Sequence, residues 1–263
     1  MSNYSWGLPI AASTYAKKID HSFWILHVVM IGLFVGWGIY MAYCMVRYRQ
    51  KKGVAAHYTH HIPWKSYIPD VAMFLFEVWL IFIVGVPIWA HIKEDLPKPE
   101  NATVINIRAE QFTWLAHYPG PDGIFGKQDI KKSNADNPLG LDETDPNGKD
   151  DIIAVDALYI PLGKPVLVNL TAKDVIHSFF IPEFRIKQDA VPGMKIPIWF
   201  EPNQTGTFEL VCAQLCGAGH YRMRADVFVK TPEQFDAWVQ EQEQAKTAAA
   251  ASSNAAAATA EVW

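Results

Sequence analysis

The sequence predicts a two-helix transmembrane hairpin followed by a β-rich soluble domain. Two long apolar segments near the N-terminus and a series of short alternating segments after residue 103 lead to this prediction. The 263 residues are 50% hydrophobic, which is enough chain for one or two domains with a sizeable core. The formal net charge of -4 is close to neutral and gives no reason to expect nucleic acid as a partner.

The first apolar segment covers residues 22–46 and contains no Asp, Glu, Lys or Arg. Because roughly 20 apolar residues span a bilayer as a helix, this segment is long enough to cross a membrane. It is also too long for the apolar part of a signal peptide. The second segment, residues 69–92, is interrupted by Glu77. Two buried helices of a soluble core are the alternative, but the chain offers no third apolar segment to cover them.

Basic residues predict how the hairpin is oriented. The connecting loop holds five Lys or Arg side chains between Arg47 and Lys65, whereas Lys93 and Lys98 are the nearest after the second segment. Loops rich in Lys and Arg stay in the cytoplasm. We therefore expect both ends of the chain, including the large C-terminal part, on the periplasmic side.

From residue 103 the hydrophobic pattern takes the two-residue period of β-strands. Seven short runs are separated by Pro, Gly, Asn and Asp, which is typical of a sandwich or a barrel. A helix is expected at 231–245, because Thr231, Pro232 and Gln234 supply a cap, a first-turn proline and a capping-box partner. The chain is therefore predicted to consist of a lead-in (1–21), a hairpin (22–92), a linker (93–102), a β domain (103–245) that contains an acidic insertion (120–151), and a low-complexity tail (246–263).

The insertion at residues 120–151 is rich in turn residues and carries eight Asp or Glu against four Lys. Loops of this length inside a compact domain are usually functional or disordered. We interpret it as a solvated surface excursion, with an acidic docking patch for a basic partner as the alternative. A calcium-binding EF-hand loop is excluded, because Ala154 stands where that loop needs a bidentate carboxylate.

The stretch ELVCAQLCGAGHYRM, residues 209–223, concentrates side chains that bind metals. It holds Cys212 and Cys216, two of the three cysteines, together with His220 and Met223. Haem attachment is excluded because the chain has no C-x-x-C-H. A disulfide explains neither the histidine nor the methionine, and zinc is poorly served by a thioether. Soft sulfur ligands with imidazole favour copper, and the disulfide and zinc remain alternatives.

A mononuclear blue-copper site needs a second histidine. His177 is the candidate, because it lies among β-branched and aromatic residues at the mouth of a predicted strand. From there it can face the loop at 212–223.

The paired motifs DVIHSFFIPEFRIKQDAVPG (174–193) and GTFELVCAQLCGAGHYRM (206–223) closely resemble subunit II of the haem-copper cytochrome c oxidases. The resemblance covers roughly residues 20–245. It implies that the β domain is a cupredoxin-like Greek-key barrel with a binuclear copper centre, CuA. By position, Cys212 and Cys216 would bridge both coppers, one copper would add His177 and Met223, and the other would add His220 and the main-chain carbonyl of Gln214.

The resemblance also implies an activity. The chain would accept single electrons from a cytochrome c and pass them to haem in subunit I, which carries haem and CuB, in an oxygen-reducing, proton-pumping complex of the bacterial inner membrane. The CuA subunit of a nitric-oxide reductase and a membrane-anchored copper chaperone are the alternatives. Such chaperones also pair Cys-x3-Cys with a distant His, but they lack the His-x2-Met continuation. The subunit II of a quinol oxidase lacks the copper ligands altogether.

The sequence departs from the family pattern at two places. Gln214 replaces a glutamate that often ligates magnesium at the subunit interface, and because an amide is a weaker ligand, the usual magnesium site is in doubt. Phe112 replaces the tryptophan at which electrons usually enter, whereas Trp114 is retained. Electron transfer through Phe112 or Trp114 is therefore expected, with core packing as the alternative for Trp114. A membrane-bound or tethered cytochrome c is the expected donor.

Two acidic residues accompany the second apolar segment. In the family, a glutamate near the cytoplasmic end of this helix opens a proton-uptake route into subunit I. Glu77 or Asp70 would take this part, because ionisable residues in a membrane span are often functional. The two are seven residues apart and share a helix face. Packing against a polar residue of a partner subunit is the alternative.

Overall fold

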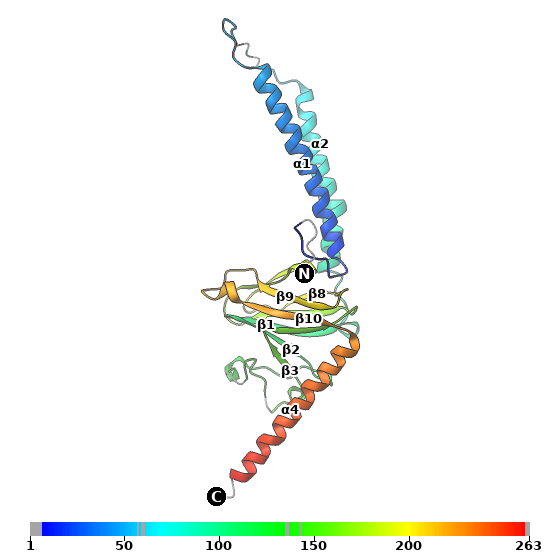
Figure 1. The fold of residues 1–263 in the computed structure, drawn as a ribbon, viewed down its shortest axis with the longest axis vertical. Coiled ribbons are helices and arrows are strands. Elements are labelled where there is room, and N and C mark those ends of the chain that lie inside the picture. Colours follow the sequence, from blue (N-terminus) through cyan, green and yellow to red (C-terminus); the bar gives the residue numbers. More distant parts are fainter. Residues whose placement is uncertain (1–6, 57, 59–60, 135–136, 143, 261–263) are drawn as a thin grey trace. The chain divides into compact units, whose positions relative to one another are not determined.

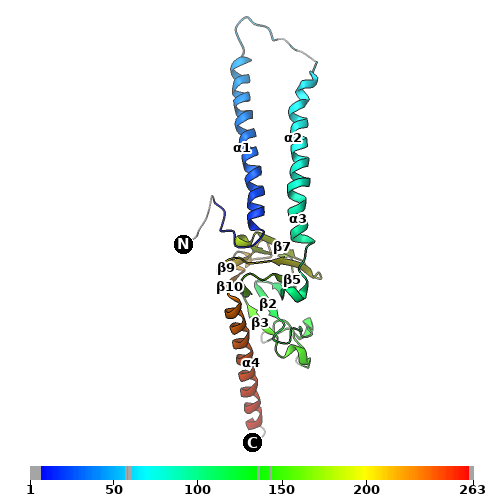
Figure 2. The same cartoon turned by 90° about the vertical axis from the view of Figure 1, so that its right-hand side faces the viewer.

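The computed structural model describes residues 7–56, 58, 61–134, 137–142 and 144–260 of the chain (Figures 1 and 2). Its contacts divide the chain into two units. One unit is the helical hairpin Lys17–Glu94, and the other joins Met1–Ala16 to Asp95–Trp263.

The hairpin consists of two long apolar helices joined by a loop (Figure 2). The first is α1, Ala16–Arg47. The second runs through η1 (Trp64–Tyr67), α2 (Ile68–Trp79), the π-helical turn η2 (Leu80–Gly85) and α3 (Val86–Lys93). Both helices are long and apolar enough to cross a membrane, and the apolar stretch of each is exposed. Both segments expected from the sequence are therefore helical.

The β unit contains two five-stranded sheets (Figure 1). The first sheet has the order β3-β2-β1-β5-β8, with strands Ile152–Val155, Thr113–Tyr118, Thr103–Glu110, Val166–Ala172 and Ile196–Phe200. The second has the order β4-β10-β9-β6-β7, with strands Ala157–Pro161, Arg224–Lys230, Gly206–Cys212, His177–Ile181 and Ile186–Ala190. The pairs β1–β5 and β4–β10 are parallel, and the other pairs are antiparallel.

Aromatic rings from both sheets meet between them and form the core. The ring of Phe179 on β6 lies 5.9 Å from that of Trp114 on β2 and 6.4 Å from that of Phe200 on β8. The ring of Phe184 joins this cluster, 5.3 Å from that of Phe200. Offset and edge-to-face contacts of this kind add to the stabilisation that burial of the rings supplies. The two sheets therefore pack face to face as a sandwich.

The lead-in packs on the β unit. The buried hydroxyl of Ser13 donates to the carbonyl of Phe184 at 2.8 Å, and that of Tyr15 donates to the carbonyl of Trp199 at 3.1 Å. The ring of Tyr15 also meets that of Trp199 edge-on at 5.8 Å. The sequence predicts only a short lead-in, of which residues 1–6 lie outside the described part. Residues 7–16 belong to the β unit, and α1 begins at Ala16.

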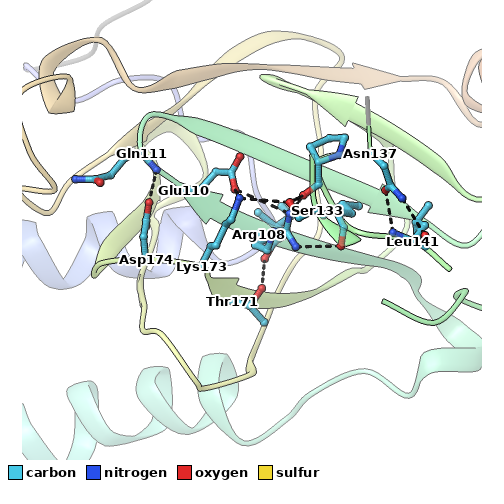
Figure 3. Close-up of polar contacts among 12 residues, drawn as sticks. Arg108, Glu110, Gln111, Ser133, Asn137, Leu141, Thr171, Lys173 and Asp174 are labelled. Atoms are coloured by element: carbon cyan, nitrogen blue, oxygen red, sulfur yellow. Dashed lines mark hydrogen bonds and ion pairs between the residues drawn. The ribbon is translucent and has the colours of Figure 1, made fainter. Parts of the chain in front are cut away.

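The insertion is held together by its own aspartates. Six of these side chains accept hydrogen bonds from main-chain N–H groups of the insertion: Asp122, Asp129, Asp142, Asp145, Asp150 and Asp151. The side-chain amide of Asn137 donates to the main-chain carbonyl of Leu141 and accepts from its main-chain N–H (Figure 3). Aspartate and asparagine stabilise turns in this way. These carboxylates hold the turns of the segment itself, which favours a surface excursion over a docking patch.

Helix α4, Pro232–Ala260, follows β10. The capping box is confirmed, since Gln234 N–H donates to the Thr231 hydroxyl at 3.3 Å and Thr231 N–H donates to the Gln234 side chain at 3.2 Å. The ring of Trp238 stacks on Tyr159 at 4.3 Å and meets Tyr118 edge-on at 5.1 Å. The helix continues beyond residue 245, where the predicted helix ended, into the low-complexity tail.

Trp238 should contribute most of the attachment of α4. We expect Trp238→Ala to lower the free energy of unfolding by about 3–5 kcal/mol, because a large buried ring is removed. Trp238→Phe should cost clearly less, since a ring remains to stack on Tyr159. Denaturant unfolding of the full chain in detergent measures both, and equal losses in the two variants would contradict this role for the stack.

Candidate metal centre

Strand pairing brings two distant parts of the chain together. Cys212 is the last residue of β9, and His177 is the first residue of β6. The two strands are neighbours, with Phe179 of β6 opposite Cys212. After Cys212 the chain makes a short loop and enters the 3-10 turn η7, His220–Arg222. His177 therefore lies beside the loop that carries the cysteines.

The six expected ligands converge on one point. Cys212 Sγ lies 4.0 Å from His177 Nδ1, 3.2 Å from the carbonyl oxygen of Gln214 and 3.9 Å from Cys216 Sγ. Cys216 Sγ in turn lies 3.7 Å from His220 Nδ1 and 3.8 Å from Met223 Sδ. The ligand atoms of His177, Cys212 and Cys216 all fall within 4.8 Å of one another.

Most of this cluster is shielded from solvent. His177, Met223, Cys216 and Cys212 are 0%, 2%, 4% and 8% exposed. His220 is half-buried, and Gln214 is an exposed residue whose carbonyl faces the cluster. Among the described residues both thiols are free, so no disulfide joins them. Burial of this kind strengthens electrostatic interactions among the donors.

Asp174 fixes the orientation of His177. Its Oδ1 atom lies 2.9 Å from His177 Nε2, which leaves Nδ1 to face Cys212. Burial disfavours the imidazolium, but hydrogen bonds to Cys212 and Asp174 outweigh it and raise the pKa of His177. Burial also opposes ionisation of Asp174, and hydrogen bonds from His177, Gln111 and Val175 lower the pKa of its carboxyl nonetheless.

The two thiols differ in acidity. Burial opposes ionisation of Cys212, but hydrogen bonds from His177 and from the main chain of Gln214 and Ser178 lower the pKa of its thiol. Burial and the neighbouring charge of Cys212 raise the pKa of Cys216. Thiolates are the metal-binding form of cysteine, so a metal ion would have to displace the proton of Cys216.

The donor set indicates which metal the cluster suits. Two thiols, two imidazoles, a thioether and a carbonyl exceed the four ligands that a structural zinc takes. A thioether within reach of a thiolate favours a soft metal. The cluster therefore fits copper.

Two aromatic side chains flank the cluster. The buried ring of Trp114 lies 6.3 Å from that of His177. The half-buried ring of Phe112 packs against Gly217 and Gly219 of the cysteine loop. Both residues at which electrons were expected to enter thus lie beside the cluster. Glu77 and Asp70 lie on α2, in the hairpin unit.

Sequence reasoning assigned no role to Asp174 or Gln111, both of which contact the expected ligands. Asp174 lies three residues before His177, a spacing that could have signalled a partner for the imidazole. Gln111 gave no comparable signal, because its contact with Cys216 joins residues 105 positions apart.

Comparison with known proteins places this arrangement in a family. Residues 107–230 match the family model described as cytochrome c oxidase subunit II, periplasmic domain. The alternative cytochrome c oxidase subunit 2 of Bradyrhizobium diazoefficiens is 37% identical over 247 residues, which cover 90% of this chain and 84% of that protein. The chain belongs to the cytochrome c oxidase subunit II family.

Other relatives agree. Cytochrome c oxidase subunit 2 of Thermostichus vulcanus is 30% identical over 92% of this chain and 80% of its own length. A crystal structure of the periplasmic domain of subunit II of cytochrome oxidase from Bradyrhizobium japonicum is 28% identical, with a TM-score of 0.41, over 56% of this chain and 96% of that one. Membership confirms the expected fold class, two apolar helices followed by a cupredoxin-like β domain. It also favours a subunit II over the copper chaperone.

Phe112 and Gly219 should depend on each other. A Cβ atom at Gly219 would lie 2.5 Å from the Phe112 ring, so Gly219→Ala should destabilise the chain by about 1–3 kcal/mol. In a chain that already carries Phe112→Ala, the Gly219→Ala substitution should cost much less, because the ring with which the new Cβ atom clashes is gone. Thermal denaturation of the wild type, both single variants and the double variant measures the coupling. Additive losses would show that the two residues do not press on each other.

Proposed function

We propose that the chain is the subunit of cytochrome c oxidase at which electrons enter, taking them singly from a cytochrome c through a binuclear CuA centre and passing them to haem in subunit I. Subunit I would carry out oxygen reduction and proton pumping. The observation that supports this function most directly is the convergence of two thiols, two imidazoles, a thioether and a carbonyl in a member of this family.

The proposed ligand set follows the family pattern residue by residue. Cys212 and Cys216 would bridge two coppers, His177 and Met223 would complete one of them, and His220 with the Gln214 carbonyl would complete the other. Copper held in this way supplies one-electron oxidation and reduction. The 3.9 Å between the two sulfurs and the burial of both cysteines support a shared, water-shielded arrangement.

The surrounding residues would keep the ligands in place. Asp174 holds the Nε2 side of His177 and so presents Nδ1 to the metal, the usual partnership of a carboxylate with a ligating histidine. Strand β6 fixes His177 at one side, and the loop after β9 carries the other ligands. Phe112 and Trp114 offer conjugated rings beside the centre, by which electrons from a membrane-bound or tethered cytochrome c would arrive.

The hairpin would anchor the chain in the bacterial inner membrane, with the copper domain in the periplasm. The five basic residues of the connecting loop and the match to a periplasmic-domain family support this orientation. Asp70 and Glu77, both on α2, are the candidates for proton uptake toward subunit I. Glu77 lies in the last turn of α2 directly before the π-helical turn, and such turns are frequent at functional sites.

A nitric-oxide reductase subunit would carry the same copper centre. The relatives named cytochrome c oxidase subunit 2 favour the oxidase. The partner that copurifies with the full chain from its native membrane distinguishes the two complexes.

The copper centre itself can be tested by loading the full chain in detergent. We expect two copper ions per chain and a paramagnetic resonance spectrum with one unpaired electron shared equally between two copper nuclei. Cys216→Ser should abolish this signal, because a bridging thiolate is removed. Cys44→Ser is the matched control, since Cys44 lies on α1 in the other unit. A single-copper spectrum, or copper that a mild chelator removes within minutes, would contradict the CuA assignment.

A further inference from the structure

Gln111 contacts both chain segments that carry the proposed copper ligands, the one with His177 and the one with the cysteines. It lies between β1 and β2, where its main-chain N–H donates to Asp174 Oδ2 at 2.8 Å (Figure 3). Its side-chain Nε2 donates to the carbonyl of Cys216 at 2.6 Å. A single residue therefore joins the segment that carries His177 to the loop that carries the cysteines.

Each of these contacts reaches a ligand directly or through one neighbour. Asp174 uses its other oxygen, Oδ1, to accept from Val175 N–H at 2.7 Å and to hold His177 Nε2 at 2.9 Å. The Cys216 carbonyl belongs to the same residue as a proposed bridging thiol. A shift of Gln111 would thus act on the His177 segment and on the cysteine loop together.

The cysteine loop leaves a space into which Gln111 fits. Gly217 has a φ of 133°, a backbone conformation that side chains rarely adopt. A Cβ atom there would lie 2.8 Å from Gln111 Nε2 and 3.1 Å from the Phe112 ring. Glycine at this position lets the amide reach the Cys216 carbonyl.

The strands on either side hold Gln111 and Asp174 in register. Their preceding residues, Glu110 and Lys173, form an ion pair at 2.8 Å (Figure 3). The N–H of Lys173 also donates to the carbonyl of Ala109 at 2.9 Å. Parallel pairing of β1 with β5 aligns Ala109 with Ala172. The Gln111–Asp174 contact is thus the last step of an ordered ladder between two strands.

We propose that Gln111 is a positioning residue of the copper centre, which keeps the Cys216 loop and the His177 segment at a fixed separation. This inference rests on the proposed function. Residues that orient metal ligands typically change metal affinity by about 10–100-fold when they are replaced. Gln111 is placed to do so from both sides of the cluster.

Two variants at this position test the proposal in the full copper-loaded chain. Gln111→Met removes the donor at similar length, and Gln111→Glu sets a carboxylate against the Cys216 carbonyl. Gln204→Glu is the matched control, because Gln204 Nε2 also donates to a main-chain carbonyl, that of Ala11 at 3.1 Å, away from the metal cluster. The measurements are the rate at which a chelator removes copper, the copper hyperfine pattern, and the melting temperature of the metal-free chain.

We expect both Gln111 variants to lose copper at least about tenfold faster than the control and to show an altered hyperfine pattern. Their metal-free melting temperatures should match that of the control, which separates positioning from general stability. If the wild type shows the shared two-copper signal while both Gln111 variants behave like the control, the positioning role is overturned and the proposed function stands. A wild type without that signal overturns the proposed function instead. Should Gln111→Glu fail to fold, Gln111→Met decides.

Discussion

The pairing of β6 with β9 is the interaction on which the site depends. It sets Phe179 opposite Cys212 and so delivers His177, which is 35 residues distant in sequence, to the cysteine loop. The same pairing places Phe179 in the core, where it meets rings from the other sheet. Packing energy between the sheets therefore fixes the register of the strands that hold the ligands. A slip of one residue would turn His177 to the opposite face of its sheet.

Burial creates a second constraint, since polar groups placed inside the domain need hydrogen-bond partners. Asp174 supplies one for His177, and Gln111 satisfies the Cys216 carbonyl. A metal would bind the remaining donor atoms, which otherwise face one another across 3.2–4.0 Å. Strand ends and hydrogen bonds hold the ligand segments, so the proposed site would need little rearrangement to take a metal. Preorganisation of this kind suits an electron relay, whose ligands should move little between oxidation states.

The sequence could predict what depends on local pattern. Both apolar helices, the seven alternating runs that lie on strands and the capping box of α4 were visible because each is encoded over a few residues. The strands β2, β3 and β7 were not expected. The β2 strand carries His117, which is buried and bonded to Asp151 at 2.7 Å, so a polar residue stands where the pattern calls for an apolar one. Contacts across long sequence distances, such as that of Gln111, leave no periodic trace.

The insertion shows how such contacts can link a surface segment to the centre of a domain. Arg108 on β1 donates to the carbonyls of Pro138 and Leu139 in the insertion, and Lys173, the residue directly after β5, lies 3.4 Å from the hydroxyl of Ser133 (Figure 3). Glu110 pairs with Lys173 on the same strand ends. The next residues along the chain are Gln111 and Asp174, which hold the segments that carry the proposed ligands. The insertion is therefore fastened to the strand ends that support the proposed copper centre.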